Sequence, residues 1–467
     1  MSFEGVFANV LNRWMRPPPS RRTGDGLRLG RSLQNGRPGA VFLANRRRVE
    51  HVAILGKSGA GKTNLLLSLA EQHFERHEGF IFFDFHGDAT NHLIRIAAQR
   101  PDAAEHLVLV DLSDPDRSPG INPLEGSQGS EGLSSQSSEL ASILRQRWHV
   151  DSFGARTEEL LRNTLHTLSE CGHTIVEVPL LLTSKPFRES LVHRLTNPEV
   201  RDYWTERYEG LSEPMKAAFR EPLLNKLTEF ISEPACRHFL GQKRSTIRLA
   251  ESIERGDWIV VCLPKGQLRH HAQTLGNLIC AHLLFAVLAR IRIPEGQRRI
   301  FSILCDEVQN LAENANTLIT LFAEGRKFSS SLITTTQFID QVPRELRSAM
   351  FSAGTLAIFR VSAADAAVLA PELTGGRARL PRQPPDLGLG EAWVRVGASE
   401  PVLVSVPRAS SPATTAKASE LREAVLLKYS RPRLEIDAEI ATTRRGSFID
   451  TSPAVTEDQP GEGQHGW

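Results

Sequence analysis

One eight-residue segment constrains the fold of this chain more than any other part of the sequence. It matches the phosphate-binding pattern G-x-x-x-x-G-K-T in full and reads Gly56-Lys57-Ser58-Gly59-Ala60-Gly61-Lys62-Thr63. In this pattern backbone N–H groups wrap around a phosphate, the lysine reaches the β and γ phosphates, and the final hydroxyl ligates Mg²⁺. The segment therefore predicts a Mg·ATP site in which these eight residues bind the nucleotide, Lys62 takes part in catalysis and Thr63 binds the metal.

The sequence around this segment supplies the strand–loop–helix context that the pattern requires. Residues 51–55 form an apolar run directly before it, and residues 63–74 carry apolar side chains at helical spacing directly after it. Near-continuous apolar runs also occupy 79–84 and 106–112. Such runs are typical of parallel strands that are buried on both faces, so they predict a parallel sheet covered by helices.

The alternation of strands and helices is interrupted once. Residues 130–254 read mainly as helices, and one more helix is expected at 416–429; strands resume at 258–263, 300–305, 331–336, 355–361, 392–396 and 402–406. We predict an α/β fold of the RecA-like P-loop NTPase type, with a mostly parallel central sheet and an inserted all-helical domain. The expected parts are an amphipathic N-terminal helix with a basic linker (1–40), the two halves of the nucleotide-binding domain (41–129 and 255–408), the inserted all-α domain (130–254), and a C-terminal helix with an acidic disordered tail (409–467).

A second half-site is expected where the apolar strand at 300–305 ends in two acids. Asp306 and Glu307 follow this strand, at the carboxyl edge of the sheet where α/β proteins bind ligands. Asp306 would hold Mg²⁺ directly or through water, and Glu307 would polarise the attacking water. An acidic helix N-terminus after a strand would look the same, but the phosphate-binding segment upstream favours the catalytic interpretation.

Three further polar positions follow strands or precede them. Gln337 ends the strand at 331–336, where it could bond the γ-phosphate or simply cap the strand. Arg326 precedes that strand and could stabilise charge on a transferred phosphoryl group, including one bound in a neighbouring subunit, or be an ordinary surface arginine. His86 lies in the motif 84–88 after the second strand, without the partner spacing of a metal site.

The composition indicates the cellular compartment of the protein more clearly than it indicates its binding partners. The formal net charge is +2, which excludes no partner class, and the five cysteines include no C-x-x-C pair, as expected for free thiols in a reducing cytoplasm. Residues 1–50 carry ten arginines against three acids, whereas 436–467 carry six acids against two arginines. No uninterrupted apolar run reaches the roughly 20 residues that a spanning helix needs, and no signal peptide is recognisable, so no transmembrane segment is expected.

The first residues form a separate feature. Residues 3–15 carry apolar side chains at helical spacing, with arginines at 13 and 16. A short isolated helix is marginal in water, so this one should bury its stripe against the chain's own ATPase domain, a partner protein or an anionic membrane surface. Our hypothesis is that it docks a partner.

The ordered motifs resemble the HerA/FtsK superfamily of ring-shaped DNA motors, and especially the conjugative coupling proteins of type IV secretion (TraG/TraD-like). The resemblance covers about 41–373. It rests on the phosphate loop, a D-P-H-G-D block with Phe85 in place of proline, a G-x-N-P-L block at 120–124, D-E-x-x-N at 306–310, R-K-x-G…Q at 326–337 with Ser329 in place of glycine, and F-R-V-S…D at 359–365. From the length of the stretch before Gly56 we expect it to contain neither the transmembrane helices of coupling proteins nor the β-barrel of HerA proteins.

This resemblance implies a cytoplasmic ATPase, peripheral to the inner membrane, that hydrolyses ATP with Mg²⁺ to translocate DNA through a homo-hexameric ring. The ATP site would lie between subunits, with Arg326 as the arginine finger supplied in trans and Gln337 as the sensor. The alternative is an ATPase that drives a protein partner or secreted cargo. A nucleotide-gated scaffold with little turnover is disfavoured because Lys62, Thr63, Asp306 and Glu307 are all present.

Overall fold

The computed structural model describes residues 26–34, 39–125, 154–376, 379–410 and 416–449, with four isolated positions between 138 and 144. The helix expected at 3–15 and the acidic tail beyond 449 lie outside the described residues, so the docking hypothesis for that helix stays a prediction.

The described residues build one large sheet in the order β2-β1-β12-β11-β10-β3-β9-β8-β4-β7-β5. The seven strands from β10 to β5 are parallel, and β11, β12, β1 and β2 extend them as an antiparallel flank. The strand bounds are β1 Gly26–Ser32, β2 Ala40–Ala44, β3 Val52–Leu55, β4 Phe80–Asp84, β5 Leu107–Asp111, β7 Trp258–Cys262, β8 Phe301–Cys305, β9 Ser330–Thr336, β10 Thr355–Ile358, β11 Glu391–Val396 and β12 Val402–Ser405. The predicted α/β class with a mostly parallel central sheet is therefore confirmed.

Every residue of the seven parallel strands is buried, which explains why their sequences lack alternation. The chain crosses from β3 to β4 and β5 in one direction and from β7 to β8, β9 and β10 in the other. Right-handed crossovers therefore put the first set of helices on one face and the second on the opposite face. The first set is α3 Lys62–Arg76, α4 Asp88–Ala97 and α5 Ala103–His106; the second is α13 Leu249–Arg255, α14 Lys265–Leu268, α15 His271–Leu288, α16 Ala315–Glu324 and α17 Arg344–Phe351.

One part of the N-terminal linker prediction is wrong. Residues 26–32 form β1, which pairs with β2 on one side and β12 on the other. Leu27 and Leu29 are buried there, with 0% and 1% of their surface exposed. The alternating apolar side chains in this arginine- and glycine-rich stretch were too few to signal a strand, because β1 depends on a partner strand more than 370 residues later.

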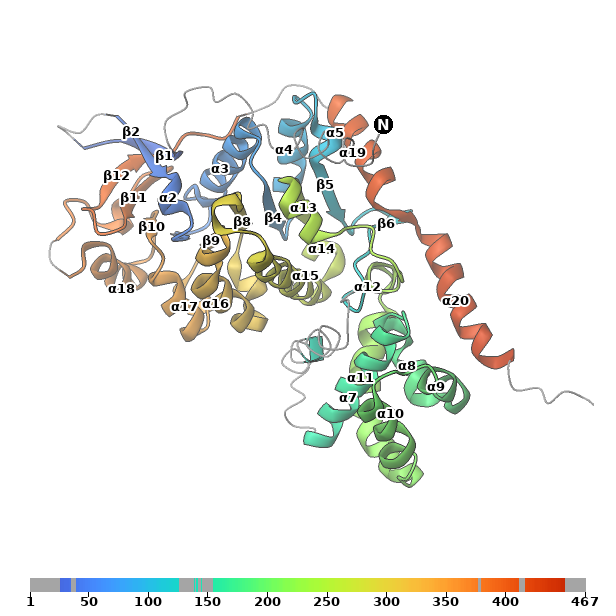
Figure 1. Cartoon of the computed structure of the whole chain (residues 1–467). Helices are drawn as coiled ribbons and strands as arrows, with labels where there is room; N and C mark the ends of the chain where they lie inside the picture. The colour runs from blue at the N-terminus through green and yellow to red at the C-terminus, as the bar shows by residue number, and fades with distance from the viewer. Residues whose placement is uncertain are drawn as a thin grey trace, which may run out of the picture.

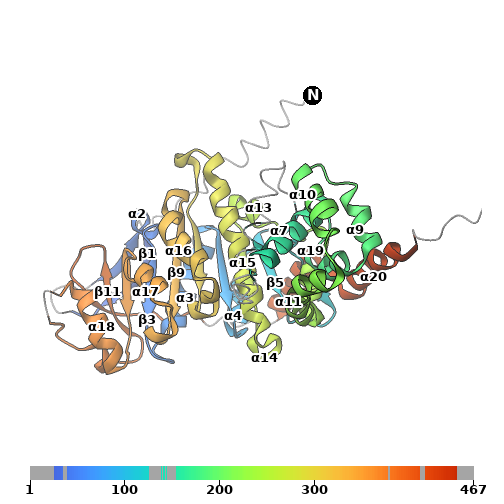
Figure 2. The same cartoon turned by 90° about the horizontal axis from the view of Figure 1, so that it is seen from below.

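The described residues between β5 and β7 in the sequence form a group of helices. The exception is the short strand β6 Arg117–Ser118, which pairs with β13 Arg431–Pro432. The helices are α7 Ala155–Glu170, α8 Val178–Thr183, α9 Lys185–Val192, α10 Pro198–Asp202, α11 Glu213–Ser232 and α12 Pro234–Leu240. Both views place this group beside the β5 end of the sheet, while α18 Ala363–Thr374 and the antiparallel flank lie at the other end (Figures 1 and 2).

Two C-terminal helices connect the sheet to this helical group. α19 Ala416–Tyr429, as expected at 416–429, packs on β5 and α4 and ion-pairs Arg422 with the buried Asp111. No sequence pattern predicted α20, Arg433–Ile449, which runs along the helical group (Figure 1). Its Asp437 lies 3.0 Å from the buried His238 of α12. Within the part predicted as a C-terminal helix and acidic tail, residues 433–449 thus form a second helix.

One described helical stretch, His271–Arg292, is long and apolar enough to cross a membrane by length and composition alone. It comprises α15 and the turn after it, and 72% of its most apolar window is buried within the fold. Its apolar character is explained by packing between α13, α16 and the segment after β8.

The amino edge of the sheet contains a histidine that folding keeps neutral. His51 is 4% exposed, and its Nδ1 accepts the backbone N–H of Leu332 at 3.0 Å. Burial, together with the nearby charge of Arg326, lowers the pKa of His51 to about 4. The unfolded chain takes up this proton near pH 6.5 and the folded chain does not, so stability is lost as pH falls from 6.5 toward 4.

We predict that His51→Asn flattens part of this pH dependence. Asparagine tolerates the positive φ of 68° at this position and offers an acceptor that does not protonate. The wild-type unfolding free energy should lose about 1.4 kcal/mol per pH unit from this group between pH 6.5 and 4. The variant should be less stable at pH 7, because the ring contact with Phe322 is lost, but should have a shallower slope. Denaturant titrations at several pH values measure both, and equal slopes would contradict the assignment.

Candidate functional site

The phosphate-binding segment connects β3 to α3 at the carboxyl edge of the sheet. Gly61 has φ 116°, a left-handed conformation that favours glycine. Gly56 is required for a different reason, since a Cβ there would lie 2.6 Å from Cβ of Phe359. Lys62 folds back over the loop and donates from Nζ to the carbonyl oxygen of Lys57 at 3.0 Å. The loop is thus held in a compact form by its own lysine.

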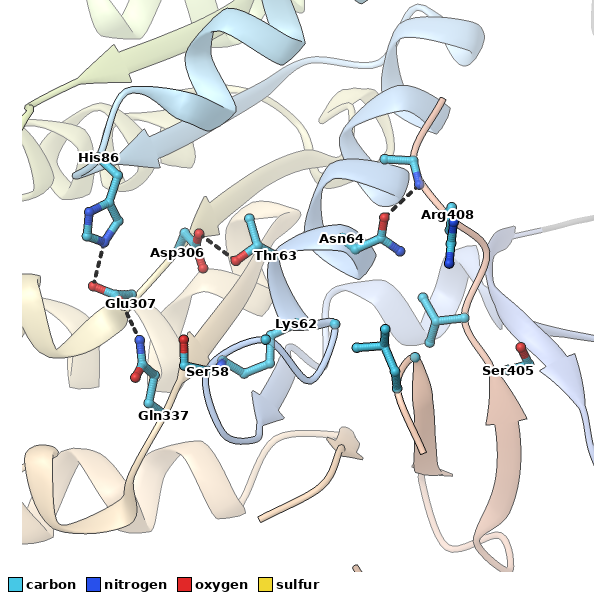
Figure 3. A pocket seen from close by; sticks show the side chains of 16 residues that line it. Ser58, Lys62, Thr63, Asn64, His86, Asp306, Glu307, Gln337, Ser405 and Arg408 are labelled. Carbon is cyan, nitrogen blue, oxygen red and sulfur yellow. Dashed lines mark hydrogen bonds and ion pairs between the residues drawn. The ribbon is translucent and has the colours of Figure 1, made fainter. Parts of the chain in front are cut away.

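A pocket of about 860 Å³ opens over this loop and collects polar residues from several strand ends. Figure 3 shows its two ends, with His86, Glu307 and Gln337 at one and Asn64 and Arg408 at the other. The lining residues are Ser58, Gly59, Gly61, Lys62, Thr63, Asn64, His86, Asp306, Glu307, Gln337, Leu389, Gly390, Ser405, Val406, Arg408 and Ala409. Its size is in the range of small-molecule and cofactor sites.

Thr63 and Asp306 meet inside this pocket. The Thr63 hydroxyl donates to Oδ2 of Asp306 at 3.0 Å, and the Thr335 hydroxyl donates to Oδ1 at 2.7 Å. Burial raises the pKa of Asp306 above its usual value, and the charges of Glu307 and Asp84 add to this, although both hydroxyl bonds act in the opposite direction. Burial likewise lowers the pKa of Lys62, against the attraction of Asp306 and Glu307. Burial thus disfavours the charged forms of both Asp306 and Lys62.

The donor set fits a Mg²⁺ ion. A buried carboxylate and a hydroxyl at 3.0 Å are hard oxygen ligands, and Mg²⁺ is commonly held by one or two such protein groups together with phosphate and water oxygens. Among the described residues there is no cluster of three or more His, Cys, Asp or Glu side chains that could hold a metal alone. A Mg²⁺ ion at this position would complete its shell with phosphate and water oxygens.

Glu307 follows Asp306 in an unusual backbone conformation. Its φ and ψ are 57° and 66°, in the left-handed region, and its N–H donates to the Thr335 hydroxyl at 2.9 Å. Burial tends to raise the pKa of its carboxyl, but the hydrogen bonds from His86 and Asn310 and the charge of Lys265 hold the pKa below its usual value. Glu307 is therefore an ionised carboxylate, as a general base must be.

The structure brings Gln337 into the pocket but leaves Arg326 out of it. Gln337 Nε2 donates to Oε1 of Glu307 at 2.5 Å. Arg326 lies exposed in the turn Gly325–Phe328, before β9, whereas the pocket lies after β9. Seven residues of strand separate the two ends, a distance of about 20 Å. Arg326 cannot act on a nucleotide bound to its own chain in this conformation.

Sequence reasoning missed the rim opposite Glu307. Asn64 Nδ2 donates to the carbonyl oxygen of Pro407 at 2.6 Å, and its Oδ1 accepts the N–H of Ala409 at 2.7 Å. Gly390 N donates to the carbonyl oxygen of Ala60 at 3.0 Å. Residues 405–409 thus run across the start of α3, and nothing in their composition signalled this. His86 was noted in its motif, but its partner Glu307 is 221 residues away.

Known proteins resemble this chain in one sequence region and in overall fold. Residues 28–124 match the family model described as Helicase HerA, central domain. The structure of the bacterial conjugative coupling protein TrwBdeltaN70 shares 17% identity over 85% of this chain and 92% of its own, with a TM-score of 0.58. The structure of TrwB in complex with a non-hydrolysable ATP analogue shares 16% identity over 86% of this chain and 99% of its own, with a TM-score of 0.58. The structure of VirB4 of Thermoanaerobacter pseudethanolicus shares 15% identity over 84% of this chain and 99% of its own, with a TM-score of 0.54.

No curated protein matches the chain in sequence. At 15–17% identity the structural likenesses establish the fold, which is that of these P-loop ATPases. The resemblance indicated by the sequence motifs, to HerA proteins and conjugative coupling proteins, is therefore confirmed.

Proposed function

We propose that this chain is a Mg²⁺-dependent ATPase that acts as a motor. The observation that carries the proposal is the contact between Thr63, at the start of α3, and Asp306, at the end of β8, beside Lys62 and Glu307. These four residues come from segments 243 residues apart and meet at the pocket. The structures of TrwB with an ATP analogue and with ADP and Mg²⁺ support a nucleotide in the same fold.

In the proposed reaction, Lys62 leaves the carbonyl oxygen of Lys57 and neutralises the phosphates. Glu307 takes a proton from a water molecule while the oxygen of that water attacks the γ-phosphorus. The bond between the γ-phosphorus and the β,γ-bridging oxygen then breaks and releases ADP. Thr63 and Asp306 would hold Mg²⁺, which supplies charge stabilisation on the phosphate oxygens when bound. Gln337 contacts Glu307 in this state and is placed to exchange that bond for one to the γ-phosphate.

The position of Arg326 favours an assembly in which subunits complete one another's sites. A residue about 20 Å from its own pocket can reach a nucleotide only on another copy. One subunit would offer Arg326 to the pocket of the next, a head-to-tail contact that generates a ring when the rotation closes. We propose a homo-hexameric ring with Arg326 as the in-trans finger.

DNA is the cargo we propose, with a protein partner or secreted substrate as the alternative. The family model is named for a helicase, and TrwB is named a conjugative coupling protein. On this chain the exposed Arg244 and Arg269 and the half-buried Lys265 are candidate contacts to a phosphate backbone. Such contacts give sequence-independent binding that weakens steeply with salt.

The first prediction separates nucleotide binding from turnover. Lys62→Ala should weaken Mg·ATP binding by about 10- to 100-fold, because a charged hydrogen-bond donor to phosphate is lost. Glu307→Gln should bind ATP normally but lower kcat by about 100-fold or more, because the base is lost and the shape kept. Calorimetric titration and a phosphate-release assay test this, with matched melting temperatures as the control. Near wild-type turnover of Glu307→Gln would remove Glu307 from this role.

The second prediction tests the shared site. Arg326→Ala and Lys62→Ala proteins should each be inactive as ATPases, and mixing them should restore part of the activity. Mixed assemblies contain some pockets with Lys62 from one subunit and Arg326 from its neighbour. Subunit exchange must be shown independently by native mass spectrometry. Absence of recovery at every mixing ratio, despite exchange, would contradict the in-trans role.

The third prediction distinguishes DNA from protein cargo. ATPase rate should rise on addition of DNA of any sequence, and DNA affinity should fall steeply between about 50 and 200 mM salt. Arg269→Gln should reduce the salt dependence without changing ATP affinity, with Arg431→Gln as the matched control, because Arg431 pairs with Glu439 and neither residue lines the pocket. A rate that DNA leaves unchanged would favour the protein-cargo alternative.

A further inference from the structure

Three donors from three different segments hold the carboxylate of Glu307. His86, after β4, places Nε2 3.1 Å from Oε2, and Asn310, in the turn after β8, donates Nδ2 to the same oxygen at 3.3 Å. Gln337, after β9, donates to Oε1 at 2.5 Å. Both oxygens of the proposed base are therefore engaged by the protein (Figure 3).

The three bonds differ in how a nucleotide would affect them. Gln337 can turn from Glu307 to a γ-phosphate, which would free Oε1. His86 and Asn310 contact the other oxygen, Oε2, and His86 lies on the side of Glu307 opposite Gln337 (Figure 3). If only Gln337 turns away, Oε2 stays bonded to His86 and Asn310, and the Glu307 backbone keeps its N–H bond to Thr335.

His86 is presented to Glu307 by a rigid turn. The buried Asp84 accepts the N–H groups of His86 and Gly87 at Oδ1, at 2.9 and 3.0 Å. Its Oδ2 accepts the N–H and hydroxyl of Thr90, both at 2.8 Å. Both carboxylate oxygens of Asp84 thus accept hydrogen bonds from this turn and the start of α4. These bonds hold the backbone from which the half-exposed imidazole of His86 extends.

The same turn contacts the start of α14 and the second turn of α15. Lys265 N donates to the carbonyl oxygen of Phe85 at 3.1 Å. A methyl group added at Gly276 of α15 would lie 3.0 Å from the Phe85 ring and 2.9 Å from Leu311. Asn277 Nδ2 also lies 3.4 Å from the carbonyl oxygen of Asn310. Both donors to Oε2 therefore lie on segments packed against the start of α15.

The corner itself is exposed, basic and strained. Arg269, between α14 and α15, has φ 51° and ψ −130°, a conformation that non-glycine residues rarely adopt. Its exposed side chain is adjacent to His270, which is also exposed. A ligand that binds to this corner could move the start of α15 and, with it, His86 and Asn310, the two donors to Oε2.

We propose that His86 is a positioning residue that holds Glu307 in a resting orientation, and that displacement of the α14–α15 corner releases it for hydrolysis. The inference rests on the proposed ATPase function, with Glu307 as the base, and adds a restraint on that base. It explains why the turn after β4 carries a histidine that contacts neither the loop lysine nor Asp306.

The test compares three single variants of the full chain. His86→Leu removes the donor, and His86→Gln keeps a donor near the position of Nε2. His92→Leu is the matched control, because it removes a histidine–glutamate pair of similar length, 2.9 Å to Glu71, on the neighbouring helix. In the absence of DNA, His86→Leu should raise kcat by roughly tenfold, as expected for loss of a charged hydrogen bond from the resting state, with KM for ATP unchanged. His86→Gln and His92→Leu should match the wild type.

Two results would overturn the proposal. A fall in kcat for His86→Leu would show that His86 assists the base, and equal rates for His86→Leu and His86→Gln would show that the donor is irrelevant. DNA should stimulate His86→Leu less than the wild type. If DNA stimulates neither protein, the DNA-motor function fails, while the DNA-free comparison still decides the role of His86.

A readout independent of turnover completes the experiment. With ¹⁵N-labelled histidine, the Nε2 resonance absent from His86→Gln identifies His86. Glu307→Gln should shift that resonance in the nucleotide-free protein, because the acceptor loses its charge. An unchanged resonance would overturn the restraint even if the protein hydrolysed no ATP.

Discussion

The contact of Asp306 with two hydroxyl groups is the interaction on which the site depends. Thr63 belongs to the helix after β3, Asp306 ends β8 and Thr335 lies in β9, so the two bonds connect three segments at the carboxyl edge of the sheet. They form only if β9 lies between β3 and β8, in parallel and in register. Because the carboxylate is buried and its pKa raised, an unpaired Asp306 would be costly, and the strand order and the pocket stabilise each other.

Much of this arrangement could be predicted from the sequence because it is encoded locally. The apolar runs that became β3, β4, β5, β7, β8 and β9 are short and bounded by polar residues, and the phosphate loop and the Asp306–Glu307 pair follow two of them. Parallel strands bring their carboxyl ends to one edge, so the meeting of Thr63 with Asp306 follows from the motifs. Whether Lys62 and Glu307 perform the proposed chemistry stays a prediction.

What could not be predicted depends on pairings between distant segments. His86 reaches Glu307 because β4 lies next to β8, and no local pattern specifies that order. The rim at 405–409 carries no motif, and its role comes from two bonds with one side chain, Asn64. The local sequence of β1 resembles a linker, and the strand forms only because β12, more than 370 residues later, pairs with it. The distance of Arg326 from the pocket likewise follows from the direction of β9 and not from its neighbours in sequence.

The order of strands in the sheet also has a consequence for biosynthesis. β3, which carries the phosphate loop, has β9 and β10 as its neighbours, and these begin only at Ser330 and Thr355. A nascent chain that has reached the helical group therefore contains a fully apolar strand without either native neighbour. Such long-range parallel pairing forms slowly and leaves apolar, aggregation-prone segments exposed in the meantime. Chaperones protect nascent chains with such segments from aggregation. The pocket acquires its rim only when Pro407 and Ala409 have left the ribosome, so the loop made early in translation is completed by some of the last folded residues.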